Sequence, residues 1–192
     1  MKRLFKKAVE DPIHFPPLSR AIFPGDKVVL VPDPFVLAHG RLLETLIDHL
    51  IDYGITPSDI TVMMTEQERS LAEKNDHLQS LITKKEKKGV VFHSFLPYKP
   101  DSCSILCNRS DGEPIALARP LVDADVVIPV ERHYQTPPFG HYGTLSALAP
   151  RFCDLQTQIH FTAGDRPEKE KRSSRSSPPK FGRPPGNSVS RW

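Results

Sequence analysis

KVVLVPD, residues 27–33, holds four consecutive aliphatic side chains, Val28–Val31. The turn-forming triplet Pro24-Gly25-Asp26 precedes this run, and two prolines flank Asp33 directly behind it. A short aliphatic run between turns is typical of a strand that is covered on both faces, as in a parallel sheet. Ligands of such sheets bind beyond the carboxyl ends of the strands, so we expect Asp33 to lie at a binding site.

Helical and extended patterns alternate along the rest of the chain. Apolar residues recur at helical spacing in two segments, each of which ends at a glycine. An Asp-Gly pair between two later extended runs indicates a β-hairpin. The predicted elements are helices over 37–53 and 66–88, sheet strands over 27–31, 60–64, 90–95 and 126–130, and hairpin strands over 104–108 and 114–118. This order predicts an α/β fold: a Rossmann-like domain with a mainly parallel sheet, flanking helices and an inserted β-hairpin.

Three regions differ in composition. Residues 1–24 contain four prolines, which favours an extended N-terminal arm. Residues 25–164 carry the α/β pattern. Residues 165–192 are rich in Ser, Arg and Pro and cannot bury apolar surface, so we expect a disordered basic tail.

Charge and cysteine content exclude several classes of function. The tail holds eight of the 26 basic residues and three of the 23 acidic ones, which leaves residues 1–164 with a net charge of −2. A nearly neutral folded region makes nucleic acid an unlikely partner. No apolar run approaches the length of a membrane span. Three sparse cysteines and the lack of a secretory signal favour a cytoplasmic location.

The segment 131–151 follows the carboxyl end of a predicted strand and is rich in His, Gly and Pro. It supplies His133 and His141 as candidate catalytic residues, and Tyr142 and Gly143 as candidate binding residues alongside Asp33. Simpler roles remain open, because Asp33 can cap the following helix and the histidines can lie in an ordinary exposed loop. The spacing of the two histidines is a weak metal signal, so no metal site is predicted.

Three segments together carry a resemblance to a known family. They are DPIHFPPLSRAIFPGDKVVLVPD at 11–33, GITPSDITVMMT at 54–65 and DGEPIALARPLVDADVVIPV at 111–130. Their order resembles the N-terminal domain of the nickel-dependent lactate racemase family.

The resemblance implies isomerase chemistry on small 2-hydroxy acids or related sugar acids. Family members are racemases and epimerases with two domains, and their active site lies in the cleft between these domains. Their nickel-pincer nucleotide accepts a hydride from the substrate α-carbon and returns it to either face. A lysine holds this cofactor covalently, two histidines exchange the hydroxyl proton, and another histidine ligates nickel.

Several family positions carry other residues here. Asp33 matches the aspartate of the family's S-D-x-T-R-P motif, but Val36 stands where its arginine is expected. Arg69 falls at one acid/base histidine, and Ser146 falls at the cofactor lysine. His133 and His141 remain for the second acid/base role, and His160 is the candidate for the nickel ligand. The resemblance therefore predicts a catalytically incomplete chain in which the cofactor is not covalently bound.

Two hypotheses explain these departures. The chain is a divergent relative and, independently of this, its gene is truncated or frameshifted near residue 165. Another chain is a candidate source of the missing second domain. The alternative function is a non-catalytic α/β domain that binds a small anion or a protein. As a further alternative, the basic tail binds acidic surfaces or RNA through phosphate charge.

Overall fold

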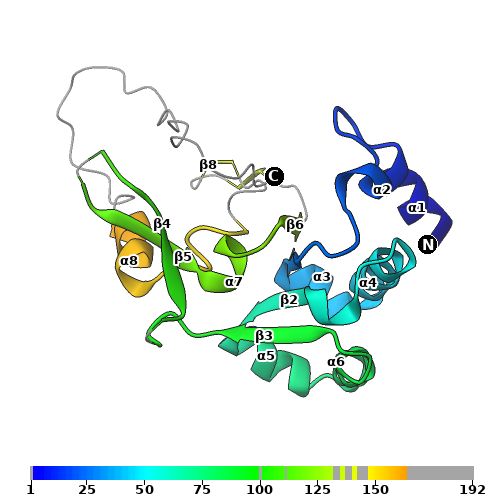
Figure 1. Ribbon diagram of the computed structural model, residues 1–192. Helices are drawn as coiled ribbons and strands as arrows, with labels where there is room; N and C mark the ends of the chain where they lie inside the picture. The colour runs from blue at the N-terminus through cyan, green and yellow to red at the C-terminus, as the bar shows by residue number, and fades with distance from the viewer. Residues whose placement is uncertain are drawn as a thin grey trace.

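A computed structural model describes residues 2–99, 101–110, 112–131, 135–136, 140–141 and 147–163 (Figure 1). Four parallel strands form the central sheet in the order β3-β2-β1-β6. The strands are β1 Val28–Pro32, β2 Ile60–Thr65, β3 Val91–Phe95 and β6 Val126–Val130. Each begins and ends within one residue of its predicted position, which confirms the α/β fold.

Each of the two long predicted helices is interrupted. The first consists of α3 Pro34–His39 and α4 Arg41–Asp52, separated by Gly40 in a left-handed conformation with φ of 62°. The second consists of α5 Glu66–Glu73 and α6 Asp76–Glu86. The side chain of Asn75 accepts a hydrogen bond from the backbone N–H of Leu78 and so begins a new helix. None of the helices in these described ranges is long and apolar enough to cross a membrane.

The two faces of the sheet have different covers. Val28 and Leu30 face one side, where α3, α4 and α6 supply most of the apolar contacts. Val29 and Val31 face the other side and pack against the hairpin and residues 147–153. Because consecutive residues of β1 point in opposite directions, its apolar run is needed to fill both cores.

The hairpin is confirmed and covers the second face together with α7 Arg119–Val122 and residues 147–153. Its strands are β4 Cys103–Asn108 and β5 Pro114–Ala118, followed by α7 and, later, α8 Leu155–Ala163. Figure 1 shows this hairpin and α8 on one side of the sheet, with α1 and α4 on the opposite side. A second, two-residue hairpin pairs β7 Gln135–Thr136 with β8 Gly140–His141.

The expectation of an extended N-terminal arm is wrong, because α1 Lys2–Glu10 and α2 Leu18–Ala21 are helices. The carboxylate of Glu10 links α1 to its neighbours by accepting hydrogen bonds from the Tyr53 hydroxyl and from Ser19 Oγ. Phe5 packs edge-on against the His49 ring at a centroid distance of 5.8 Å. The prolines lie after α1, so they leave its backbone hydrogen bonds intact.

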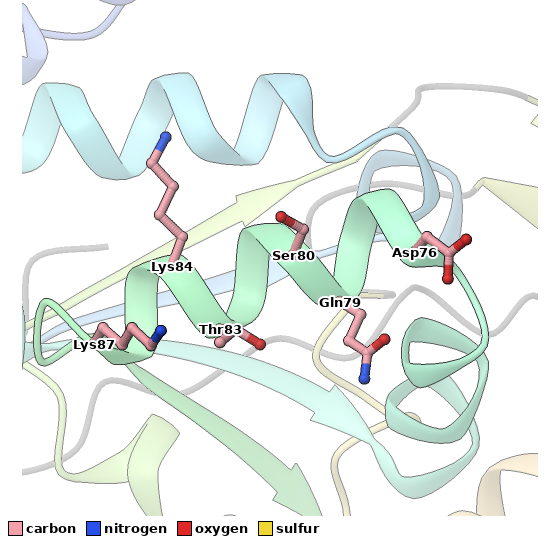
Figure 2. Close-up of a pocket in the computed structure, with 6 residues that line it drawn as sticks. All are labelled: Asp76, Gln79, Ser80, Thr83, Lys84 and Lys87. Atoms are coloured by element: carbon pink, nitrogen blue, oxygen red, sulfur yellow. The ribbon is translucent and has the colours of Figure 1, made fainter.

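Two ion pairs join α4 to α6, and they differ in burial. Lys84 Nζ lies 3.0 Å from Glu44 Oε1, and Figure 2 shows this lysine reaching from α6 toward α4. One residue further on, the Lys85 side chain is fully buried and pairs with Asp48. A cluster of lysines such as that at 84–88 is typical of a solvated helix end. Lys85 does not fit this interpretation, because its side chain is buried.

We expect Asp48→Ala to reduce the free energy of unfolding by about 3 kcal/mol, because it leaves the Lys85 ammonium buried without its carboxylate. Glu44→Ala is the matched control, since it removes the exposed pair between the same two helices and costs about 0–1 kcal/mol. Urea unfolding followed by circular dichroism measures both values. Equal costs for the two variants would contradict the structural role of the buried pair.

Candidate functional site

The carboxyl ends of β1 and β6 lie side by side and bring two acidic residues together. Pro32 is paired with Val130, and the backbone N–H of Asp33 donates to the Val130 carbonyl at 3.0 Å. The Asp33 carboxylate accepts from the Val36 backbone N–H at 2.6 Å and so caps α3. Asp33 is thus a helix cap at the edge where ligands of parallel sheets bind. Its binding role stays a prediction.

Glu131 directly follows β6 and was not singled out by the sequence analysis. Its Oε1 atom is buried and has no hydrogen-bond partner among the described residues. Burial, followed by the nearby charge of Asp33, raises the pKa of Glu131, against opposing effects of the Ala147 backbone and Arg151. Glu131 is therefore a carboxyl group that holds its proton to a higher pH than usual.

Arg151 crosses the same edge and joins three parts of the chain. Its Nη1 donates to the Pro32 carbonyl at 3.0 Å, and its Nη2 donates to Glu68 Oε2 at 2.6 Å. The guanidinium carbon lies 4.6 Å from the ring centroid of Phe152. Its Nε atom is buried and has no partner in the described part of the chain. Arg151 therefore fixes the end of β1 against the start of α5.

Glu68 belongs to a local motif that the sequence does show. The backbone N–H of Thr65 donates to Glu68 Oε2 at 2.9 Å, and Thr65 Oγ1 accepts from the Glu68 backbone N–H at 3.3 Å. Thr-x-x-Glu before a helix is the signature of this capping box. The same carboxylate therefore caps α5 and receives Arg151, which explains why it is nine-tenths buried.

The chemistry available at this edge follows from its described side chains: three carboxyl groups, one guanidinium and two buried atoms without partners. Arg151 Nε can only donate a hydrogen bond, whereas ionised Glu131 Oε1 can only accept one. A hydroxyl group does both, so an alcohol or a water molecule suits the pair. A carboxyl group with a raised pKa also suits proton transfer.

Most of the predicted site residues cannot be compared with the structure. His133, Tyr142, Gly143 and Ser146 lie outside the described residues. His141 lies in β8, paired with Gln135, but its side chain is not described. The roles assigned to these residues therefore remain predictions.

The other family positions lie away from the edge cluster or have packing roles. Arg69 forms ion pairs with Glu73 and Glu86, both at 3.1 Å. Val36 lies in α3, and only 5% of its surface is exposed to solvent. His160 lies on α8 in a crevice beside the hairpin.

A hollow on the described surface lies elsewhere, on the outer face of α6 (Figure 2). It encloses about 570 Å³ and is lined by Asp76, Gln79, Ser80, Thr83, Lys84 and Lys87. All of these side chains are exposed, and they contribute no buried functional group. The hollow is thus a solvated helix surface, whereas the chemistry is concentrated at the carboxyl edge of the sheet.

Comparison with known proteins now decides the family. Residues 1–139 match the family model described as the lactate racemase N-terminal domain. The chain belongs to the lactate racemase N-terminal domain family. None of the curated protein sequences matches this domain significantly.

A solved structure supports the fold of this lactate racemase N-terminal domain. It is the lactate racemase apoprotein from Thermoanaerobacterium thermosaccharolyticum, with a TM-score of 0.56 and 14% sequence identity. The match covers 82% of this chain and 38% of that protein. The present chain therefore spans well under half of the solved lactate racemase.

Replacing the edge arginine should weaken the fold. We expect Arg151→Met to lower the free energy of unfolding by about 3 kcal/mol, because Glu68 then stays buried without its charge partner. Arg69→Met is the control, since its pairs are more exposed and are worth under about 1 kcal/mol. Chemical denaturation of both variants tests the difference, and a smaller loss for Arg151→Met than for the control would contradict it.

The raised pKa of Glu131 predicts a pH-dependent stability. The folded state binds this proton more tightly than the unfolded state, so its stabilising contribution is present at low pH and is lost as pH rises through the folded pKa. Glu131→Gln keeps a neutral side chain and avoids this loss. The melting temperature of Glu131→Gln minus that of wild type should therefore become more positive between pH 4 and pH 7. A difference that stays constant or falls would show that folding does not destabilise the ionised form of Glu131.

Proposed function

We propose that this lactate racemase N-terminal domain binds a small 2-hydroxy acid, or a related sugar acid, at the carboxyl edge of its sheet. The observation that carries the proposal is the convergence of Asp33, Glu131 and Arg151 at the ends of β1 and β6. The substrate hydroxyl would accept from Arg151 Nε and donate to Glu131 Oε1, which satisfies both buried atoms.

The charges of this edge fit a hydroxy acid in one orientation. Asp33, Glu131 and Glu68 repel a carboxylate, so the substrate would turn its hydroxyl toward them. Arg151 brings a guanidinium to the end of β1, where the family motif places an arginine three residues after its aspartate. Glu131 would hold the hydroxyl proton, because its pKa is raised.

The nickel-pincer nucleotide implied by the family does not fit this chain in its covalent form. The position of the cofactor lysine is Ser146, whose hydroxyl cannot form the amide. Among the described residues, no group of three His, Cys, Asp or Glu side chains is arranged to hold a metal ion. From the serine at position 146 we propose that the chain by itself binds its ligand and is catalytically incomplete.

We infer that a second domain completes the racemase or epimerase site. The family resemblance implies a site between two domains, and the present chain matches 38% of the solved lactate racemase. A cytoplasmic location is proposed with it, because Cys103, Cys107 and Cys153 all remain free thiols. The binding-only alternative needs no second domain and keeps the same edge for a small anion.

Calorimetric titration of the full chain with D-lactate, L-lactate and D-gluconate tests the proposal. At least one should bind, and propionate should bind more weakly than lactate because it lacks the hydroxyl. Glu131→Ala removes the acceptor of the substrate hydroxyl and should weaken binding about tenfold, equivalent to about 1.4 kcal/mol. Asp125→Ala is the matched control at the opposite edge, since Asp125, like Glu131, accepts one backbone N–H, here from Lys27 at 2.9 Å.

Two outcomes would overturn the proposal. One is the absence of binding by every hydroxy acid up to millimolar concentrations. The other is an equal effect of Glu131→Ala and Asp125→Ala on binding, which would show that the variants act through the stability of the fold. Equal binding of propionate and lactate would favour the small-anion alternative instead.

A further inference from the structure

The rest of the described structure covers one edge of the β4–β5 hairpin and leaves the other edge open. Backbone hydrogen bonds from residues 152–154 cover the outer edge of β5, with Ala118 N to Phe152 O at 2.7 Å and Asp154 N to Ala116 O at 3.2 Å. Leu117 and Cys153 form a β-bridge there. Within the described residues, β4 pairs with β5 alone. The hairpin thus has one covered edge and one open edge.

The open edge carries a bulge, but in the described part of the chain it has no charged residue, proline or covering segment. The sequence of β4 is CSILCN, which contains no charged residue and no proline. Ile105 and Leu106 are 66% and 47% exposed. A bulge between Ile105 and Cys107 twists the strand but adds no charge. Folded proteins normally place lysine, proline or a covering segment at such an edge, because open backbone groups bind other strands.

We propose that β4 pairs with β4 of a second copy of this chain, in an antiparallel arrangement around a two-fold axis. The two hairpins then form one four-stranded sheet. A second copy suits this edge because β4 carries no charge, so two copies pair without like-charge repulsion. Charged residues in β4 would instead repel their counterparts in the other copy. Ile105 and Leu106 of both copies lose solvent contact in this arrangement.

The cysteines provide a direct report of the pairing. Cys107 is exposed in β4, so the second copy covers its surroundings. Cys153 is fully buried, and burial raises the pKa of its thiol to about 12, so it reacts slowly. Burial also raises the pKa of Cys103. Maleimide labelling at neutral pH therefore reads mainly the exposure of Cys107.

Sedimentation velocity of the full chain from about 1 to 200 μM tests the proposal, because one pair of strands gives a small interface. Wild type should shift from monomer to dimer over this range. Ile105→Lys should raise the dimer dissociation constant at least about tenfold, since each copy then brings a lysine to the paired edge. Leu71→Lys on α5 is the matched control, because Leu71 is also 66% exposed and lies outside the hairpin.

Labelling separates pairing through β4 from dimerisation through another surface. At the highest concentration, Cys107 should react at least several-fold more slowly in wild type than in Ile105→Lys, with Leu71→Lys behaving as wild type. Melting curves check that both variants remain folded. A monomer at every concentration overturns the proposal, as does a dimer in which Ile105→Lys changes neither the dissociation constant nor the labelling of Cys107.

Discussion

Strand β1 has neighbours on all sides, and this constraint organises the molecule. It pairs with β2 along one edge and with β6 along the other, and its aliphatic side chains are at most 3% exposed. Its alternate residues enter two separate cores, so the helical layer and the hairpin layer are both built against the same strand. Since β6 runs parallel to it, Asp33 and Glu131 leave the sheet at the same edge. The candidate site is a consequence of that pairing.

Local sequence patterns were sufficient for the strands but not for the helices. Apolar runs between turn residues identified all four sheet strands, because burial on both faces permits few polar side chains. The helical spacing ran through Gly40 and Asn75 without a change, so two long helices were expected in place of four shorter ones. At Gly40 the chain turns where Leu81 of α6 approaches closely, a tertiary contact that has no local signal. Likewise, α1 is held by Glu10 and Tyr53, which are 43 residues apart.

The site residues show the same division between local and distant signals. Asp33 was predictable because it follows a buried strand, and Glu131 occupies the equivalent position after β6. Thr65 and Glu68 carry a recognisable capping motif. Arg151 is different, since its contact with Pro32 joins residues 119 positions apart and depends on the packing of residues 147–153. A guanidinium placed by tertiary packing leaves no periodic or motif signal in the sequence.

The strand order also constrains when the domain can fold during synthesis. Because β6 is the last sheet strand to be made and lies directly beside β1, a chain emerging from the ribosome carries β1 with one bare edge until residue 130 has left the exit tunnel. The second core closes later still, since Phe152 and Cys153 follow. Nascent chains that stall before this point would expose an aliphatic strand edge, which makes them natural clients for chaperones that bind extended apolar segments.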